Sequence, residues 1–208
     1  MAAFECKLTL RSADLEEFFI RALSMKERIP ERLGNPYIEL QRPLIVGLLA
    51  HSYEHSASER AIDHVEGRFQ ELDLQHVKHP NQMPDICCVA DLATWSAMKS
   101  TWGPFHPMGD ANSINPIITT SYSVHRKAIR PFTPVGAAIS SIWKKLAYEY
   151  PTLASMANYF VEADMTGVYR GKGRTWTEEV FSQDVVQRIK QGGLNNDLSS
   201  NWCMATVT

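Results

Sequence analysis

Apolar and polar residues alternate at the start of the chain, and the spacing then becomes helical. The apolar positions of the first segment are Phe4, Cys6, Leu8 and Leu10. This period of two predicts a half-buried strand. A helix is predicted next, because Ser12 offers an N-cap and Pro30 stops the element. Its apolar positions, at helical spacing, are Leu15, Phe18, Phe19, Ala22 and Leu23.

The middle of the chain is less regular. The apolar run from Leu44 to Ala50 predicts either a buried strand or the start of a helix that continues to His55. Ser56 and Glu59 have the spacing of a capping box, so a new turn is expected there. Residues 65–74 are expected to be extended, with Gly67 as a bulge. Residues 76–85 and 101–116 are expected to be loops.

The second half returns to clear patterns. Residues 117–124 are rich in threonine, serine and β-branched residues and predict a strand. Thr133-Pro134 begins an amphipathic helix that ends at Tyr150-Pro151, and a shorter helix is expected from Thr152 to Phe160. A hairpin is predicted from residues 161–170 and 175–181 around the turn at 171–174. A last helix from Ser182 stops at Gly192-Gly193, and a short tail begins at about residue 194.

These elements predict an α+β fold. Strands and helices are mixed without a regular β-α-β-α rhythm, which favours a mixed or antiparallel sheet packed with two or three amphipathic helices. The chain has 208 residues, a length that a single compact domain can have. We therefore expect one globular domain over residues 1–208.

Composition and charge narrow the functional classes. Apolar residues make up 44% and charged residues 21%, and the formal net charge is −2, so a basic coat for nucleic acid is not indicated. Four cysteines occur without C-x-x-C spacing, which favours reduced thiols and an intracellular location. The start of the chain does not have the pattern of a signal peptide, and no apolar stretch is long enough to span a bilayer. The adjacent Cys87 and Cys88 are expected to be core residues.

One short motif points to metal chemistry. His51, Glu54 and His55 form the pattern H-x-x-E-H, which on a helix places both histidines on one face, where zinc binds between them. The further acidic ligand that such enzymes need is absent between Asp110 and Glu149. The alternative is a histidine pair at the end of an apolar segment. We expect no cofactor, and the zinc site on His51 and His55 remains the alternative.

A local excess of positive charge points to an anionic partner. Between Ala111 and Arg174 there are eight basic and three acidic residues. The predicted contacts to RNA or to another anion are Arg126, Lys127, Arg130, Lys172 and Arg174. Phosphate backbones and anionic membrane surfaces bind such clusters. The alternative is an ordinary solvated face.

An apolar, proline-containing loop lies before the strand at 117–124. We expect its side chains Trp102, Phe105 and Met108 to contact a neighbouring subunit; the alternative is a loop packed on its own core. No serine or cysteine has the setting of a nucleophile, so the protein is expected not to be an enzyme.

The order of these elements resembles the matrix proteins of rhabdoviruses. The strings that carry the resemblance are FECKLTLRS (4–12), RPLIVGLLAHS (42–52) and HVEGRFQEL (64–72). The resemblance implies a non-enzymatic viral structural protein of virion and host cytoplasm that self-assembles, packs against nucleocapsid or RNA and contacts an anionic membrane surface. The lysine-rich arm and the proline-tyrosine motif of familiar members are missing. The alternatives are a viral coat or nucleocapsid protein that binds RNA, and a zinc-binding protein or H-x-x-E-H metallohydrolase.

Overall fold

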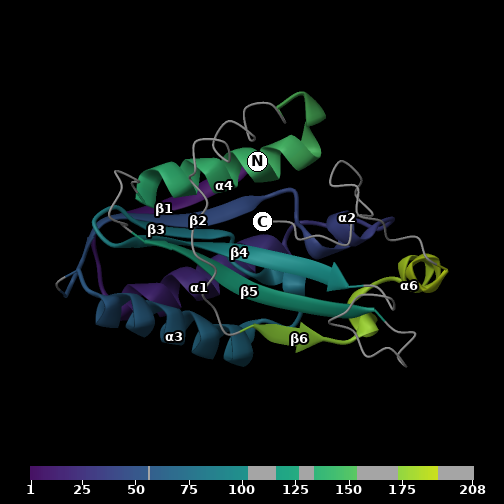
Figure 1. The fold of residues 1–208 in the computed structure, drawn as a ribbon, viewed down its shortest axis with the longest axis horizontal. Helices are drawn as coiled ribbons and strands as arrows, with labels where there is room; N and C mark the ends of the chain where they lie inside the picture. The colour runs from purple at the N-terminus through teal and green to yellow at the C-terminus, as the bar shows by residue number, and fades with distance from the viewer. Residues whose placement is uncertain (56, 103–115, 127–133, 154–172, 192–208) are drawn as a thin grey trace.

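The computed structural model describes residues 1–55, 57–102, 116–126, 134–153 and 173–191 (Figure 1). The helices of these residues are α1 (Ser12–Glu27), α2 (Pro36–Leu40), α3 (Glu59–His76), α4 (Pro134–Glu149), α6 (Gln183–Lys190) and the 3-10 turns η1 (Pro80–Gln82), η2 (Pro151–Leu153) and η3 (Glu178–Val180). The strands are β1 (Ala2–Leu10), β2 (Ile45–Tyr53), β3 (Ile86–Val89), β4 (Ala93–Trp102), β5 (Ile117–Arg126) and β6 (Arg174–Trp176).

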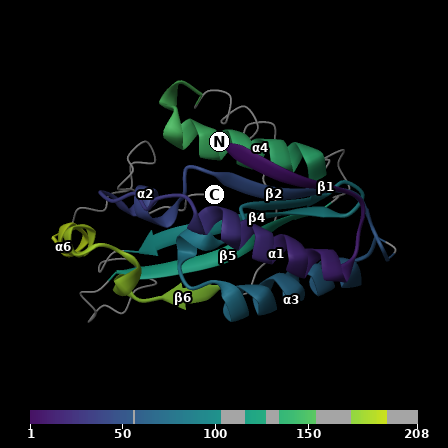
Figure 2. The same ribbon diagram turned by 180° about the vertical axis from the view of Figure 1, so that it is seen from behind.

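The strands form one mixed sheet in the order β1-β2-β3-β4-β5-β6. β1, β2 and β3 are parallel, whereas β4, β5 and β6 continue as antiparallel neighbours. The connections α1 and α3 lie together on one face of the sheet, and α4 covers the other face (Figures 1 and 2). The predicted α+β class with a mixed sheet is therefore confirmed.

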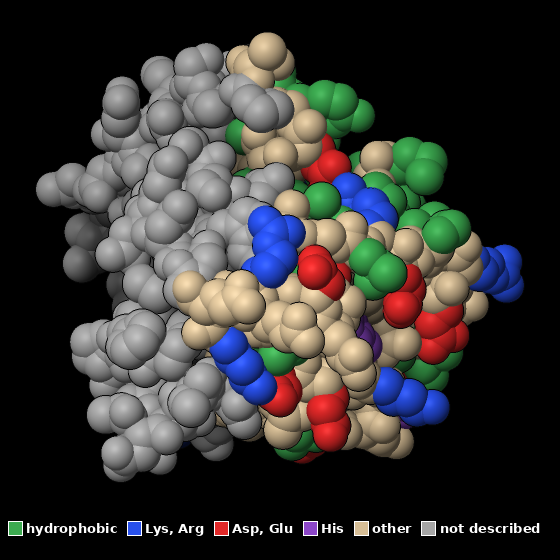
Figure 3. Space-filling view, turned by 90° about the vertical axis from the view of Figure 1, so that its right-hand side faces the viewer, with side chains coloured by type: hydrophobic (Ala, Val, Ile, Leu, Met, Phe, Trp, Pro, Cys, Tyr) green, Lys and Arg blue, Asp and Glu red, His purple; other side chains and the backbone are tan. Residues whose placement is uncertain are grey.

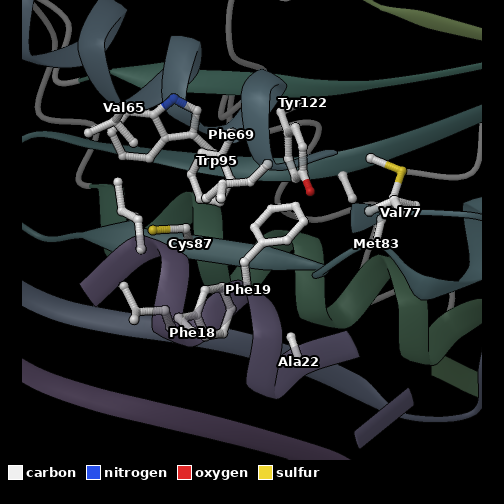
Figure 4. Close-up of a cluster of buried hydrophobic side chains, with 14 of the residues drawn as sticks. Phe18, Phe19, Ala22, Val65, Phe69, Val77, Met83, Cys87, Trp95 and Tyr122 are labelled. Atoms are coloured by element: carbon white, nitrogen blue, oxygen red, sulfur yellow. The ribbon is translucent and has the colours of Figure 1, made fainter. Parts of the chain in front are cut away.

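The larger hydrophobic cluster fills the space between the sheet and the helices α1 and α3 (Figure 4). Phe18 and Phe19 come from α1, and Phe69 comes from α3. The ring of Phe69 is tilted against those of Tyr122 and Trp95, with centroids 4.9 and 6.2 Å away. Each large aromatic side chain removes apolar surface from water and so contributes strongly to this side of the fold.

A smaller cluster lies under α4. Its buried members are Ile45, Ile86, Cys88 and Ala138. Two hydrogen bonds join the helix to the sheet: Ser96 Oγ lies 2.6 Å from Ser141 Oγ, and Thr94 Oγ1 donates to the Pro134 carbonyl. Both adjacent cysteines are buried, as predicted, and burial raises the pKa of each thiol.

Several predicted elements are confirmed, and one is wrong. The first strand and helix, the strand at 117–126 and the helices at 134–149 and 183–190 all form, and the run at Leu44 to Ala50 is a strand. Residues 65–74, however, belong to the helix α3, and Gly67 lies inside it instead of at a bulge. Ser58 caps this helix by accepting a hydrogen bond from the Ala61 amide.

Other differences concern the strands. β3 and β4, which the sequence reading did not predict, form the centre of the sheet. β6 is shorter than the strand predicted at 175–181, because η3 occupies residues 178–180. Leu8 is 80% exposed, so the apolar positions of β1 are less buried than the alternation predicted. The predicted strand at 161–170, most of the helix at 152–160 and the tail lie outside the described residues.

Within the described ranges, no helix combines the length and the apolar character that crossing a membrane requires.

Candidate anion-binding pocket

A cavity of about 240 Å³ opens at the end of the sheet where the parallel strands β2 and β3 begin. We call it the lysine pocket. Its lining comes from the segment before β2, from the residue before β3 and from the second half of α4. The polar side chains of the lining include Gln41, Arg42, Asp85, Lys145 and Glu149.

Asp85 is the central carboxylate of this region. Its backbone amide donates to the Val46 carbonyl, and its Oδ2 accepts from the Val46 amide at 2.8 Å. Oδ2 also lies 2.7 Å from Lys26 Nζ, and Oδ1 lies 3.4 Å from Lys145 Nζ. Asp85 is 2% exposed, but the adjacent lysines outweigh the effect of burial and lower its pKa to about 2. It is therefore ionised at neutral pH.

Three buried lysines surround this one carboxylate. Lys26, Lys99 and Lys145 are all at least 96% buried. Lys26 donates to the Met83 carbonyl, and Lys99 donates to the Leu40 carbonyl. Burial lowers the pKa of Lys26, and it holds the pKa of Lys99 well below its ordinary value. The group thus contains more cationic than anionic side chains in a place where charge is poorly solvated.

The other carboxylates near the pocket do not compensate these lysines. Glu149, which lines the pocket, is bound by both terminal nitrogens of Arg32 at 2.8 and 3.0 Å. Glu31 pairs with Arg42 Nη2 and is mostly exposed. Since each of these carboxylates already has its own arginine, the excess of positive charge around Asp85 remains.

Three donors on residues that line the lysine pocket have no hydrogen-bond partner among the described residues, although one of them, Lys145 Nζ, forms an ion pair with Asp85. They are Lys145 Nζ, Arg42 Nε and Gln41 Nε2. Gln41 Oε1 accepts from Lys99 Nζ, which fixes the orientation of this amide. All three residues are at least 91% buried. Because an unsatisfied buried donor is costly, a cavity lined by such donors favours a ligand that brings acceptor oxygens.

The basic residues predicted to bind RNA lie elsewhere. Arg126 ends β5 and pairs with Glu59, whereas Arg174 lies on β6 opposite Thr120. Six residues of β5 separate the two positions, a distance of about 20 Å, so the structure does not bring them together. Lys127, Arg130 and Lys172 lie outside the described residues.

Arg174 is occupied within its own fold. It donates to the carbonyls of Asp73 and Val77 at the end of α3, and its guanidinium lies 3.6 Å from the Trp176 ring centroid. On the face seen in Figure 3, the described cations are interspersed with acidic side chains. Cations of the last helix are paired as well: Lys190 Nζ lies 3.0 Å from Glu178 Oε2.

The helical interpretation of H-x-x-E-H is wrong. His51 lies on the strand β2, and His55 follows the end of that strand. The segment from His51 to His55 is therefore strand followed by a bend, and it lacks the helical turn that would place both histidines on one face. Glu54 instead accepts hydrogen bonds from the backbone and side chain of Ser12. Among the described residues, no group of three histidine, cysteine, aspartate or glutamate side chains is placed to hold a metal.

The loop predicted to contact a neighbouring subunit lies largely outside the described residues. Trp102 ends β4 opposite Ile117, but its side chain is outside the described set. Phe105 and Met108 lie in the range 103–115, which is also outside it. Their role in self-association stays a prediction.

The lysine pocket was not predicted, although two buried lysines near its Asp85, Lys26 and Lys99, left a signal in the sequence. Lys26 continues the buried stripe of α1 at helical spacing after Leu15, Phe19 and Ala22. Lys99 follows Trp95 and Ala97 with the period of a strand. A lysine on an apolar face indicates a buried charge with partners from elsewhere in the fold.

Comparison with protein families, curated proteins and solved structures gives no match for this chain.

Proposed function

We propose that this protein is a binding protein that holds the anionic group of a ligand, of the phosphate type, in the lysine pocket. The observation that carries the proposal is a set of donors on Lys145, Arg42 and Gln41 that lack a hydrogen-bond partner within the described ranges. All three belong to one cavity and none is an acceptor.

Charge supports the same ligand class. Lys26 and Lys145 lie 2.7 and 3.4 Å from Asp85, and Asp85 also acts on the buried Lys99, so an anion in the pocket would add negative charge beside this group of lysines. Lysine and arginine side chains are the usual protein partners of phosphate, because their hydrogen bonds to it are charge-assisted.

The pocket favours a single anionic group over an extended polyanion. Its volume of about 240 Å³ accommodates a small group, and its cationic side chains are recessed. A phosphate monoester therefore fits better than a duplex backbone, which is contacted by exposed cations over many residues. The self-assembling viral role and the contact with nucleocapsid stay predictions, and RNA enters the test as a separate arm.

The first experiment is calorimetric titration of the protein with inorganic phosphate, a nucleoside 5′-monophosphate and a short single-stranded RNA. Chloride at matched ionic strength is the reference. We expect phosphate and the monophosphate to bind, and Lys145→Gln to weaken both by about tenfold to a hundredfold, the range for a hydrogen bond to a charged group. Binding of RNA without binding of the small phosphates would contradict the proposal.

Lys144→Gln is the matched control. Lys144 precedes Lys145 on α4 and carries the same charge, but it does not line the pocket. Both variants remove one partly or fully buried charge, so their folding is compared by thermal unfolding without ligand. Equal losses of phosphate affinity in the two variants would show that general charge, and not the pocket, attracts the anion.

A further inference from the structure

A second cavity lies on the opposite side of the sheet from α4, between α3, β5 and β6. Its volume is about 80 Å³. We call it the Asp73 cavity. Its lining includes Asp73 of α3, Tyr122 of β5 and Arg174 of β6. None of them lines the lysine pocket.

Two buried polar atoms on residues that line this cavity have no partner among the described residues. They are Asp73 Oδ1 and Tyr122 Oη. Asp73 is 6% exposed and Tyr122 is 7% exposed. A buried carboxylate oxygen accepts hydrogen bonds only, and a phenol oxygen can accept one while its proton points elsewhere. Asp73 Oδ1 therefore lacks a donor, the reverse of the situation in the lysine pocket, and the Tyr122 hydroxyl is able to accept from the same donor.

The nearest cation does not meet this need. Arg174 Nη1 lies 3.7 Å from Asp73 Oδ2, but its hydrogen bonds go to the carbonyls of Asp73 and Val77. Lys99 approaches from β4 and is committed to the Leu40 carbonyl. Burial raises the pKa of Asp73 to about 6, even though Arg174 and Lys99 act to lower it. The ionised carboxylate is thus left without sufficient compensation.

We propose that the Asp73 cavity binds a small primary ammonium group, which donates hydrogen bonds to Asp73 Oδ1 and to Tyr122 Oη. A cation with several N–H donors matches the carboxylate of Asp73 and the two atoms that lack hydrogen bonds with described residues. The small volume favours ammonium or a short alkylammonium over a bulky amine.

The same chemistry has two sources, a free small amine or the side chain of a lysine in a peptide. The exposed Leu74 lies at the cavity, so a chain that carries the amine has a route from solvent. Methylammonium and the lysine side chain of N-acetyl-lysine amide are therefore tested as separate arms. Binding of methylammonium only assigns the cavity to free amines, and binding of both assigns it to the wider class.

The experiment measures the shift in melting temperature of the full chain with methylammonium chloride, at pH 7.5 and pH 5. Tetramethylammonium chloride, which lacks N–H donors, is the reference at equal concentration. We expect stabilisation by methylammonium only, and weaker binding at pH 5, where Asp73 takes up a proton. Equal shifts with both cations at pH 7.5 would overturn the proposal, because they would indicate a general salt effect.

Variants locate the effect. Asp73→Asn keeps the shape of the side chain and removes its charge, and Tyr122→Phe removes the unpartnered hydroxyl. Both are expected to weaken methylammonium binding, Asp73→Asn by about tenfold or more. Glu71→Gln is the matched control, since Glu71 lies on α3, is largely exposed and does not line the cavity. An unchanged response of Asp73→Asn would overturn the assignment, as would a crystal structure grown with methylammonium that shows only water in the cavity.

Discussion

At the scale of single residues, two buried aspartates differ because their partners differ. Asp85 has Lys26 at 2.7 Å and a backbone amide at 2.8 Å, and its pKa falls to about 2. Within the part of the chain that the structure describes, the ion-pair partner of Asp73 is the more distant Arg174, and burial raises its pKa to about 6. The number and distance of donors, more than depth of burial, decide which form of a carboxyl the fold favours.

Asp73 is therefore expected to make stability fall as pH rises. Its pKa in the folded protein, about 6, exceeds its ordinary value of 3.8. The folded state consequently binds the proton more tightly, so the stabilisation is complete below pH 3.8 and is lost as pH rises through 6. A difference of roughly two pKa units corresponds to about 3 kcal/mol.

The variant Asp73→Asn isolates this contribution. Urea unfolding from pH 4 to pH 8 would give the free energy of unfolding of both proteins. As pH rises, we expect the free energy of unfolding of the variant to increase relative to that of the wild type, by up to about 3 kcal/mol over the range. Parallel profiles for the two proteins would mean that Asp73 titrates with an ordinary pKa.

At the scale of elements, α3 shows why the prediction of an extended segment at residues 65–74 was wrong. Its buried positions Ala61, Ile62, Val65, Phe69 and Leu72 follow a helical stripe. Residues 65–74 were predicted to be extended with Gly67 at a bulge, and a glycine inside a helix is indeed unfavourable. The stripe of buried positions outweighs this local preference, since tertiary packing supplies most helical stability.

The elements that the sequence did predict have their signals within one segment. The amphipathic stripes of α1 and α4 and the turn residues that bound them are local features. β3 has only four residues, and all of them are buried. A short buried strand has no alternation to detect, and its place between β2 and β4 depends on contacts far away in the chain.

The candidate site was harder to predict than the fold for the same reason. Lys26, Asp85 and Lys145 come from three separate segments that meet only in the folded chain. Charges that cluster along the chain, such as Arg126 and its neighbours, are visible in the sequence. Buried ion pairs depend on distance in space, which a local pattern does not contain.

Alanine substitutions at two glycines, one in a strand and one in a helix, are expected to change the stability of the protein in opposite directions. A Cβ on Gly47 of β2 would lie 2.5 Å from Phe4 Cε1 and 3.2 Å from the Ile86 carbonyl oxygen, so the ring must move. A Cβ on Gly67 of α3 would meet no atom within 4 Å. We expect Gly47→Ala to cost about 1–3 kcal/mol and Gly67→Ala to stabilise by about 1 kcal/mol.

Thermal or urea unfolding of both variants checks this pair, with each serving as the other's control. A third protein tests the cause: in a Phe4→Ala background the ring is absent, so Gly47→Ala should cost less. An unchanged cost in that background would assign the strain to the Ile86 carbonyl instead of the aromatic ring.

At the scale of the whole molecule, the two sides of the sheet are held unequally. The side of α1 and α3 contains the large aromatic cluster, whereas α4 rests on a smaller one among the described residues. Lys145 on α4 faces Asp85, and its Nζ lacks a hydrogen bond with described residues. The lysine pocket therefore lies at the border of the less stabilised layer, where a ligand has most to add.

Amide hydrogen exchange tests this division, and the test rests on the proposed phosphate binding. Without ligand, the amides of α4 are expected to exchange faster than those of α3, because local opening is easier where less apolar surface is buried. Saturating phosphate should slow exchange in the second half of α4 and in residues 41–46, since the ligand would bridge Lys145 to Arg42 and Gln41. It should leave α3 nearly unchanged, which makes α3 the internal reference. Equal protection of α3 and α4 by phosphate would indicate general stabilisation by the salt. Slower exchange of α4 than of α3 without ligand would refute the inference that the α4 side of the sheet is the less stable one.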